Sequence, residues 1–272
     1  MTLEVADDVT LPPGVCLRWR ERRGSYRVAG EVENVSRLTV DPIDRVRAKR
    51  FVVREHYSGT FPAERVSVGL FRGIRLVGVA VFAEPAQRRT IPRWAPGARL
   101  GVILSRFVLL DELAANAETW FLARAFRALR RELAGVGAVV SYSDPVLRRS
   151  SDGSLVLPGH VGTIYQGFNG RYLGRSGAET ETIAPDGTIV DRRGLSKVRN
   201  GERSDAHVVD RLVALGAPGP RPFEDPRAYI ARALEDGPFR RVRHPGKHVY
   251  AWSLDGSTLA VAQSPTPKRR SE

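Results

Sequence analysis

The chain has 272 residues, and its 43 Lys and Arg against 30 Asp and Glu give a net charge of +13. With 42% hydrophobic and 27% charged residues, the composition is globular and excludes a disordered, collagenous or coiled-coil chain. The single cysteine, Cys16, excludes a disulfide framework. No apolar run reaches the roughly 20 residues of a membrane span, and the first residues lack the basic-then-apolar order of a signal peptide, so we expect a cytoplasmic protein with no membrane partner.

Changes in periodicity and turn content predict four regions. Residues 1–40 are polar and arginine-rich with little period, which predicts an irregular N-terminal segment. Residues 41–204 alternate between helical and strand patterns, which predicts the main domain. Residues 205–263 predict a basic extension of helices and strands that packs on this domain, and residues 264–272, with two prolines, predict a flexible tail.

The main domain is predicted to start with a helix and a hairpin. Asp41 followed by Pro42 is typical of a helix start, and apolar residues at helical spacing predict a helix over 43–55. β-branched residues alternate over 65–71 and 76–82 on either side of a short glycine-containing turn, which predicts a β-hairpin.

A strand, a helix and a second strand follow. The apolar run 100–110 predicts a buried strand. Asn116 is a candidate cap for a helix over 117–134, where apolar residues recur at three- and four-residue steps. Ala138–Tyr142 predicts another buried strand. The order helix, hairpin, strand, helix, strand predicts an α/β fold with a mixed central sheet flanked by helices.

The remaining predicted elements are shorter. A polar loop is expected over 146–158, followed by a strand and a helical turn near 160–165. Helices at about 205–215 and 226–235 precede a basic C-terminal stretch over 240–248.

The excess positive charge is almost wholly arginine. Four of the 43 basic residues are lysine, which leaves 39 arginines. The planar guanidinium binds phosphate at two points, and a basic surface binds polyanions through counterion release. A GC-rich genome would also enrich arginine without any partner. The charge therefore indicates either nucleic-acid binding or codon bias.

Two polar groups stand out in the predicted central strands. Ser105 and Arg106 interrupt an apolar strand, where a buried unpaired charge costs several kcal/mol. Asp144 follows the next strand, at the end of a sheet where ligands of α/β proteins bind. Arg106 can serve chemistry, or it can be a structural residue paired with Asp111 or Asp144. Asp144 can be a general base or part of a turn before Pro145.

Two further clusters are rich in side chains that can carry chemistry. The segment 159–166 has a histidine, Tyr165 and a glutamine around two glycines, and segment 167–175 interleaves aromatics with arginines. Aromatic side chains stack on bases while arginines bind phosphates, although a half-buried strand pair would also explain the pattern. His56-Tyr57 follows the first predicted helix, and a lone histidine of this kind is as consistent with a structural role.

Several of these motifs, in this order, resemble the phage Mom DNA-modification family, and the element order resembles the GNAT acyltransferase fold. The resemblance rests on His56-Tyr57, Leu104-Ser105-Arg106, Ser143-Asp144, the run 160–166 and Pro245-Gly246-Lys247-His248, and it covers about residues 41–252. It implies a GNAT-like catalytic domain over 41–204. The implied enzyme is a transferase that adds a small acetamide- or glycine-like group to N6 of adenine in double-stranded phage DNA, in the host cytoplasm, and so protects it from restriction.

The resemblance also implies which residues act. Arg106 and Asp144 correspond to active-site residues, with His56, Tyr57, Ser105 and Tyr165 as their neighbours. Because N6 lies inside the duplex stack, the base has to be flipped out. The residues that we expect to contact DNA are Arg171, Tyr172, Arg175, Lys197, Arg241, Arg243, Lys247 and His248.

The cofactor is less defined than the substrate. The resemblance implies a possible iron requirement, for which His56, His160 and Asp144 are the candidate ligands. A GNAT enzyme binds the coenzyme A pyrophosphate with a glycine-rich loop, but the stretch 113–118 has no glycine and contains Glu118. Two alternatives remain: a conventional GNAT N-acetyltransferase that uses acetyl-CoA on a small-molecule or protein amine, and a non-catalytic DNA-binding protein.

Overall fold

The chain folds into two compact units in the computed structural model. The structure describes residues 15–20, 23–28, 32–114, 116–157, 159–202, 206–262 and 265–267. The sheet unit comprises residues 5–145, 158–177 and 246–272, and the helical unit comprises residues 1–4, 146–157 and 178–245. Among the described residues, no helix combines the length and apolar character that a membrane crossing needs. The domain boundaries expected at residues 204 and 263 remain predictions.

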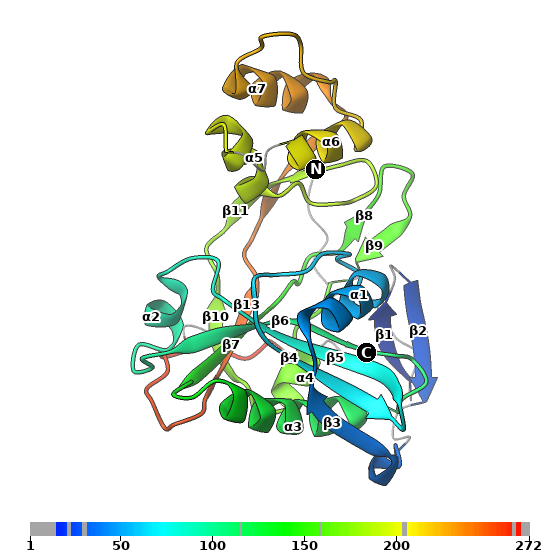
Figure 1. The fold of residues 1–272 in the computed structure, drawn as a ribbon, viewed down its shortest axis with the longest axis vertical. Coiled ribbons are helices and arrows are strands. Elements are labelled where there is room, and N and C mark those ends of the chain that lie inside the picture. Colours follow the sequence, from blue (N-terminus) through cyan, green and yellow to red (C-terminus); the bar gives the residue numbers. More distant parts are fainter. Residues whose placement is uncertain are drawn as a thin grey trace. The chain divides into compact units, whose positions relative to one another are not determined.

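The sheet unit is built on a seven-stranded mixed sheet in the order β10-β13-β7-β6-β5-β4-β3 (Figure 1). Its strands are β3 (Leu38–Pro42), β4 (Glu64–Arg72), β5 (Arg75–Ala83), β6 (Gly101–Leu109), β7 (Ala138–Ser143), β10 (Arg171–Arg175) and β13 (His248–Ser253). The β6–β7 pair is parallel and every other neighbouring pair is antiparallel. The predicted α/β class with a mixed central sheet is confirmed.

The described part of the sheet unit contains the helices α1 (Arg45–Glu55), α2 (Thr90–Trp94), α3 (Asn116–Glu132) and α4 (Thr163–Gly167). Helices α1 and α3 both pack against β4 and β5. The predicted helix start at Asp41 is wrong, because Asp41 lies in the edge strand β3 and Asp44 is the cap, accepting a hydrogen bond from the Arg47 N–H at 2.9 Å. An edge strand tolerates Pro42, which has no N–H to donate.

Helix α3 supplies much of the core. Phe121 and Phe126 are buried on its inner face, at the spacing that the sequence predicted. Phe126 meets the Phe82 ring of β5 edge-on, with 5.5 Å between centroids, and Phe121 stacks with Phe107 of β6 at 5.6 Å. These aromatic contacts fix α3 against the same strand that carries Ser105 and Arg106.

The N-terminal region differs from the irregular segment expected over 1–40. It contains an antiparallel hairpin of β1 (Val15–Arg20) and β2 (Arg23–Val28), followed by the 3-10 turn Val35–Arg37 and β3. The hairpin was not predicted because its second strand, RGSYRV, has few apolar residues and so lacks a clear apolar alternation.

The helical unit combines three helices with two small ribbons. Its elements are β8 (Arg148–Arg149), β9 (Leu155–Leu157), β11 (Glu179–Ile183), α5 (Arg192–Arg199), α6 (Ala206–Ala214), α7 (Pro226–Asp236) and β12 (Arg240–His244). Leu195, Leu212 and Ile230 are buried together and belong to its separate core. The two helices predicted near 205–215 and 226–235 are confirmed, whereas α5 and β12 were not predicted.

Candidate functional site

The central strands β6 and β7 separate partway along their length. Their parallel pairing covers only Gly101–Ile103 with Ala138–Val140, although both strands continue beyond it. Where the pairing ends, the Ser141 hydroxyl donates a hydrogen bond to the Leu104 carbonyl oxygen at 3.0 Å. Beyond this point the two strands continue without pairing with each other.

Strand β6 also bulges at the same place. Phe82 of β5 pairs with Leu104, and Val81 pairs with Arg106, so Ser105 is an extra residue on β6. A bulge redirects the side chains around it and is common beside active sites. The two polar residues that interrupted the apolar strand in the sequence are thus the residues that form this bulge and follow it.

Arg106 is held by hydrogen bonds to neutral groups. Its Nε donates to the Thr60 carbonyl oxygen at 3.0 Å, its Nη2 to the Thr60 hydroxyl at 2.8 Å, and its Nη1 to the Ser105 carbonyl oxygen at 2.7 Å. Burial lowers the pKa of Arg106, while Tyr57 and Tyr165 nearby act in the opposite direction. The guanidinium is therefore a fixed, partly desolvated cation between two phenols.

His56 lies next to this arginine and is neutral. The Ser58 N–H donates to its Nδ1 at 3.1 Å, so the ring proton resides on Nε2. Burial, reinforced by Arg106 and His160, lowers the pKa of His56 to about 3. Its ring packs on Tyr57 with 4.2 Å between centroids. His56 can therefore donate a hydrogen bond from Nε2 at neutral pH, but it is not a cation there.

The neutral His56 makes the fold sensitive to acid. The unfolded chain protonates His56 near its ordinary pKa of 6.5, whereas the folded pKa is about 3. Between these values the unfolded state binds more protons, so stability falls as the pH drops from 6.5 towards 3. We expect His56→Gln to lose less stability than the wild type in urea unfolding between about pH 6.5 and about pH 4.5. His207→Gln, at an exposed position of α6, should follow the wild type, and an equally steep loss in His56→Gln would contradict the prediction.

His160 connects Asp144 to the rest of the cluster. The His160 N–H donates to the Asp144 carbonyl oxygen at 2.7 Å. Burial lowers the pKa of His160, and the Asp144 carboxylate partly offsets this effect. Asp144 itself is buried directly after β7. His160 and Arg106 both lower the pKa of His56. Asp144 is therefore linked electrostatically to Arg106 through His160 and His56.

Tyr165 enters the same cluster from α4. Burial raises its pKa, and a hydrogen bond with Ser141 and the charge of Arg106 act in the opposite direction. The phenol is therefore protonated at neutral pH. The sequence singled out Arg106, Asp144, His56, Tyr57, Ser105 and Tyr165. The structure places His56, Tyr57, Ser105 and Tyr165 near Arg106, and it links Asp144 to them through His160.

The sequence-based list omitted side chains that complete the cluster. Thr60 orients Arg106, and Gln166 Nε2 donates to the Tyr250 hydroxyl at 2.9 Å. Ser143 is fully buried, and among the described residues its hydroxyl has no hydrogen-bond partner. Ser143 and Gln166 had a signal in the sequence, because Ser143 precedes Asp144 and Gln166 belongs to the run 160–166, whereas Thr60 had none.

The residues expected to contact DNA are placed in different environments. Tyr172 and His248 are buried, and the Tyr172 hydroxyl lies 3.0 Å from His248 Nδ1, so neither presents a surface to a ligand. Their burial follows from β10 and β13 pairing side by side in the sheet. The others lie at least partly on the surface, namely Arg171, Arg175 and Lys247 in the sheet unit and Lys197, Arg241 and Arg243 in the helical unit.

The candidate iron ligands do not fit a metal site. Among the described residues, no group of three His, Cys, Asp or Glu side chains is arranged to hold a metal ion. A metal-binding histidine normally donates its second ring N–H to a nearby acceptor, whereas Nδ1 of His56 accepts a hydrogen bond from Ser58. His56, His160 and Asp144 are therefore better described as a hydrogen-bonding and electrostatic cluster.

The segment before α3 does not fit a coenzyme A pyrophosphate either. The Glu33 carboxylate accepts a hydrogen bond from the Ala114 N–H at 3.1 Å, and the Glu33 N–H donates to Asn116 Oδ1 at 2.7 Å. A helix N-terminus attracts anions, and here a carboxylate of the chain itself already fills that role. Glu33 is in turn paired with Arg72 at 2.9 Å, which fixes it in place.

Three solved structures show limited similarity to the chain. A tandem GNAT protein from the clavulanic acid biosynthesis pathway aligns with a TM-score of 0.39 at 9% identity, covering 81% of this chain and 100% of that one. Malonyl-CoA decarboxylase from Rhodopseudomonas palustris aligns with a TM-score of 0.34 at 14% identity, covering 82% of this chain and 57% of that one. A GCN5-related N-acetyltransferase from Kribbella flavida aligns with a TM-score of 0.32 at 18% identity, covering 85% of this chain and 59% of that one. At these values the likenesses carry no argument about activity.

The family comparison is more informative. No curated protein matches the chain. The chain does match the Mom protein family over residues 37–218, which includes β6, β7, α4 and all six residues of the assembled cluster. Because this match spans more than half of the 272 residues, the protein belongs to the Mom protein family.

Proposed function

We propose that this protein is a DNA-modifying transferase that adds a small acetamide- or glycine-like group to N6 of adenine and thereby shields phage DNA from host restriction. Family membership supports a transferase of this kind. The observation that carries the proposal is that His56 and Tyr165 lie near Arg106, which follows the end of the β6–β7 pairing, and that His160 links this group to Asp144. A purely DNA-binding protein has no need for such a desolvated cation.

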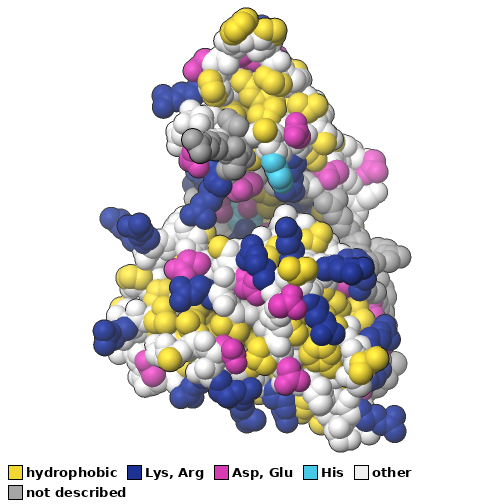
Figure 2. Space-filling view, in the orientation of Figure 1, with side chains coloured by type: hydrophobic (Ala, Val, Ile, Leu, Met, Phe, Trp, Pro, Cys, Tyr) yellow, Lys and Arg dark blue, Asp and Glu magenta, His cyan; other side chains and the backbone are white. Residues whose placement is uncertain are grey.

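The distribution of charge supports DNA as the substrate. The sheet unit has 29 Lys and Arg against 17 Asp and Glu, a net +12, whereas the helical unit has 14 against 13. Figure 2 shows Lys and Arg side chains gathered over α1. On that helix Lys49 and Arg50 are exposed and have no ion-pair partner among the described residues. Because α1 ends directly before His56, this basic face leads to the candidate site.

The chemistry assigns a role to each central group. The N6 amine forms a bond to the carbon of the donor while the bond from that carbon to its leaving group breaks. Asp144 would accept the proton that N6 loses. Arg106 would stabilise negative charge developing on the donor, and the protonated Tyr165 would give its proton to the leaving group. His56, with its proton on Nε2, would orient the substrate by donating a hydrogen bond.

The decisive experiment is a nucleoside analysis. The protein is expressed with a plasmid, the DNA is digested to nucleosides, and the products are weighed by mass spectrometry. An adenosine of increased mass, absent without the protein, is the expected result. Unaltered nucleosides from an expressed and folded protein would overturn the proposed function.

The conventional acetyl-CoA alternative makes a different prediction. Because Glu33 occupies the N–H ahead of α3, we expect no heat of binding when acetyl-CoA is titrated into the protein by calorimetry. Glu33→Gln removes the competing charge and serves as the comparison. Tight binding of acetyl-CoA to the wild type, together with indifference to DNA, would instead favour an N-acetyltransferase of small amines.

A variant of Ser143 tests substrate binding separately from protein stability. The buried hydroxyl of Ser143 has no hydrogen-bond partner among the described residues, so Ser143→Ala should leave the free energy of unfolding unchanged or raise it by about 1 kcal/mol. We expect the same variant to lower modification roughly tenfold, because the hydroxyl lies beside Gly162, as Tyr165 does, and would bond the flipped base. Tyr229→Phe, which removes a comparable buried hydroxyl in the helical unit, should leave modification unchanged. Full activity in Ser143→Ala would exclude this role for Ser143.

A further inference from the structure

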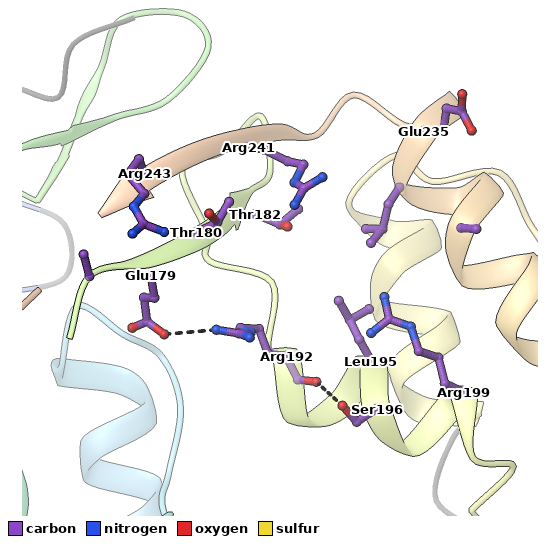
Figure 3. Close-up of a pocket in the computed structure, with 13 residues that line it drawn as sticks. Glu179, Thr180, Thr182, Arg192, Leu195, Ser196, Arg199, Glu235, Arg241 and Arg243 are labelled. Carbon is purple, nitrogen blue, oxygen red and sulfur yellow. Dashed lines mark hydrogen bonds and ion pairs between the residues drawn. The ribbon is translucent and has the colours of Figure 1, made fainter. Parts of the chain in front are cut away.

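The helical unit contains an open cavity of about 880 Å³ that the candidate active site does not use. It lies between the β11–β12 ribbon and the helices α5 and α7 (Figure 3). All of its lining residues belong to the helical unit. Four of them are arginines: Arg192, Arg199, Arg241 and Arg243.

The register of the ribbon places two of these arginines on one face. Arg241 pairs with Thr182 and Arg243 pairs with Thr180, and all four residues line the cavity. Residues two apart on a strand lie about 6.7 Å from each other on the same face. One wall of the cavity is therefore a row of two guanidinium groups, each with a threonine hydroxyl across from it.

Helix α5 forms the opposite wall with the same chemistry. Arg192, Ser196 and Arg199 follow one another at four- and three-residue steps, so they share one face of the helix over about 10 Å. Arg192 is paired with Glu179 at 3.2 Å (Figure 3). Arg199 has no side-chain partner among the described residues.

The guanidinium groups of Arg241 and Arg243, like that of Arg199, have no partner in the described part of the chain. The second acidic residue of the cavity, Glu235, points away from the arginines (Figure 3). Three like charges in one concavity repel each other unless an anion lies between them. Because the helical unit as a whole has a net charge of only +1, this repulsion reflects a local concentration of arginine rather than a general basic character.

The shape of the cavity indicates what kind of anion it takes. Its cations are spread along two walls and do not converge on one point, which suits successive phosphates better than a single one. None of the described residues that line it is aromatic, so these residues offer no surface on which a base can stack. Contacts to phosphates alone position a nucleic acid without reading its sequence.

We propose that this cavity, which we call the arginine groove, binds the phosphodiester backbone of DNA in a sequence-independent way. This inference rests on the proposed function, and it adds Arg199 to the DNA contacts that the sequence indicated. Arg241, Arg243 and Arg199 form the direct contacts, and the hydroxyls of Thr180, Thr182 and Ser196 supply further hydrogen bonds.

The test measures how DNA affinity depends on salt. Fluorescence anisotropy with a labelled duplex of random sequence gives the slope of log K against log salt for the full chain. Arg241→Gln/Arg243→Gln should reduce this slope by about 1.8, because each phosphate contact contributes about 0.9. Arg199→Gln, on a separate element, should reduce it by about 0.9. The matched control is Arg211→Gln/Arg221→Gln, which removes two exposed charges of the same unit outside the groove and should leave the slope unchanged.

The measured slopes separate a groove that binds DNA from one that binds a free nucleotide or nothing. An unchanged slope in both groove variants, or an equal fall in the control, would overturn the proposal. So would binding of ADP that the groove variants lose while their DNA affinity stays at the wild-type level, since the groove would then serve a free nucleotide. If the groove proposal alone is wrong, plasmid DNA from cells with the wild-type protein still contains the modified nucleoside. If the proposed function is wrong, that DNA contains no modified nucleoside.

Discussion

Arg106→Ala and Asp144→Asn are each expected to abolish the modified adenosine in plasmid DNA. Arg106 would stabilise charge on the donor and Asp144 would accept the N6 proton, and losing either group from a preorganised site lowers the rate by roughly 100-fold to 10,000-fold. Mass spectrometry of digested DNA measures the loss directly. Asp144→Asn keeps the shape of the side chain, so its effect reports on the proton acceptor rather than on packing.

Matched variants separate this effect from the removal of charge in general. Arg99→Ala and Asp41→Asn change exposed residues on the same unit and should modify DNA as well as the wild type does. Circular dichroism checks the fold, because Arg106→Ala also leaves the Thr60 carbonyl oxygen without its donor. Modification that survives in both Arg106→Ala and Asp144→Asn would remove these two residues from the catalytic site.

Gly162→Ala is expected to have the second largest effect. Gly162 precedes α4 with φ of +79°, and a Cβ there would lie 2.6 Å from Tyr250 Cε2 and 3.1 Å from the Ser143 hydroxyl. The left-handed conformation costs a residue with a Cβ about 1–2 kcal/mol, and the clash has to be relieved by moving α4 and Tyr165. We expect modification to fall more than roughly tenfold, since a displacement of about 1 Å can lower a rate 100-fold.

Gly73→Ala is the control for backbone strain alone. Gly73 also has a positive φ, of +59°, in the turn between β4 and β5, but a Cβ there meets nothing within 4 Å. Backbone strain should therefore lower the free energy of unfolding of both variants, as measured in urea. Only Gly162→Ala should lose modification as well. Equal activity in the two variants would show that the position of α4 is not critical.

The sequence determined the local elements and predicted the residues of the candidate site. Periods of two and of three to four residues predicted β4, β5, α3 and β7 close to their observed bounds, because apolar periodicity reflects directly which face of an element is buried. A charge inside an apolar strand pointed to Arg106, because burying a charge needs a reason, and a carboxylate directly after a buried strand pointed to Asp144. The motif order identified the family, which the match over residues 37–218 confirms.

Long-range pairing could not be predicted from the sequence. The basic stretch over 240–248 was expected to belong to a single extension, yet Arg240–His244 pairs with β11 in the helical unit and β13 inserts between β7 and β10 of the sheet. Strand partners far apart along the chain leave no local signal, because register depends on which faces are buried once the whole sheet has assembled. The sequence therefore did not reveal that β10 and β13 pair. Tyr172 and His248 were expected to contact DNA, but the pairing of these two strands buries both side chains.

By itself, the sequence determined which residues have chemistry to offer, since side-chain type, charge and local periodicity are properties of neighbouring positions. Only the tertiary structure decided which of them meet. The bulge at Ser105 depends on the backbone geometry of paired strands, and the lowered pKa of His56 and the carboxylate of Glu33 at α3 depend on residues dozens of positions away. Burial then sets the electrostatics, because the same imidazole that titrates near 6.5 in water remains neutral down to about pH 3 beside Arg106.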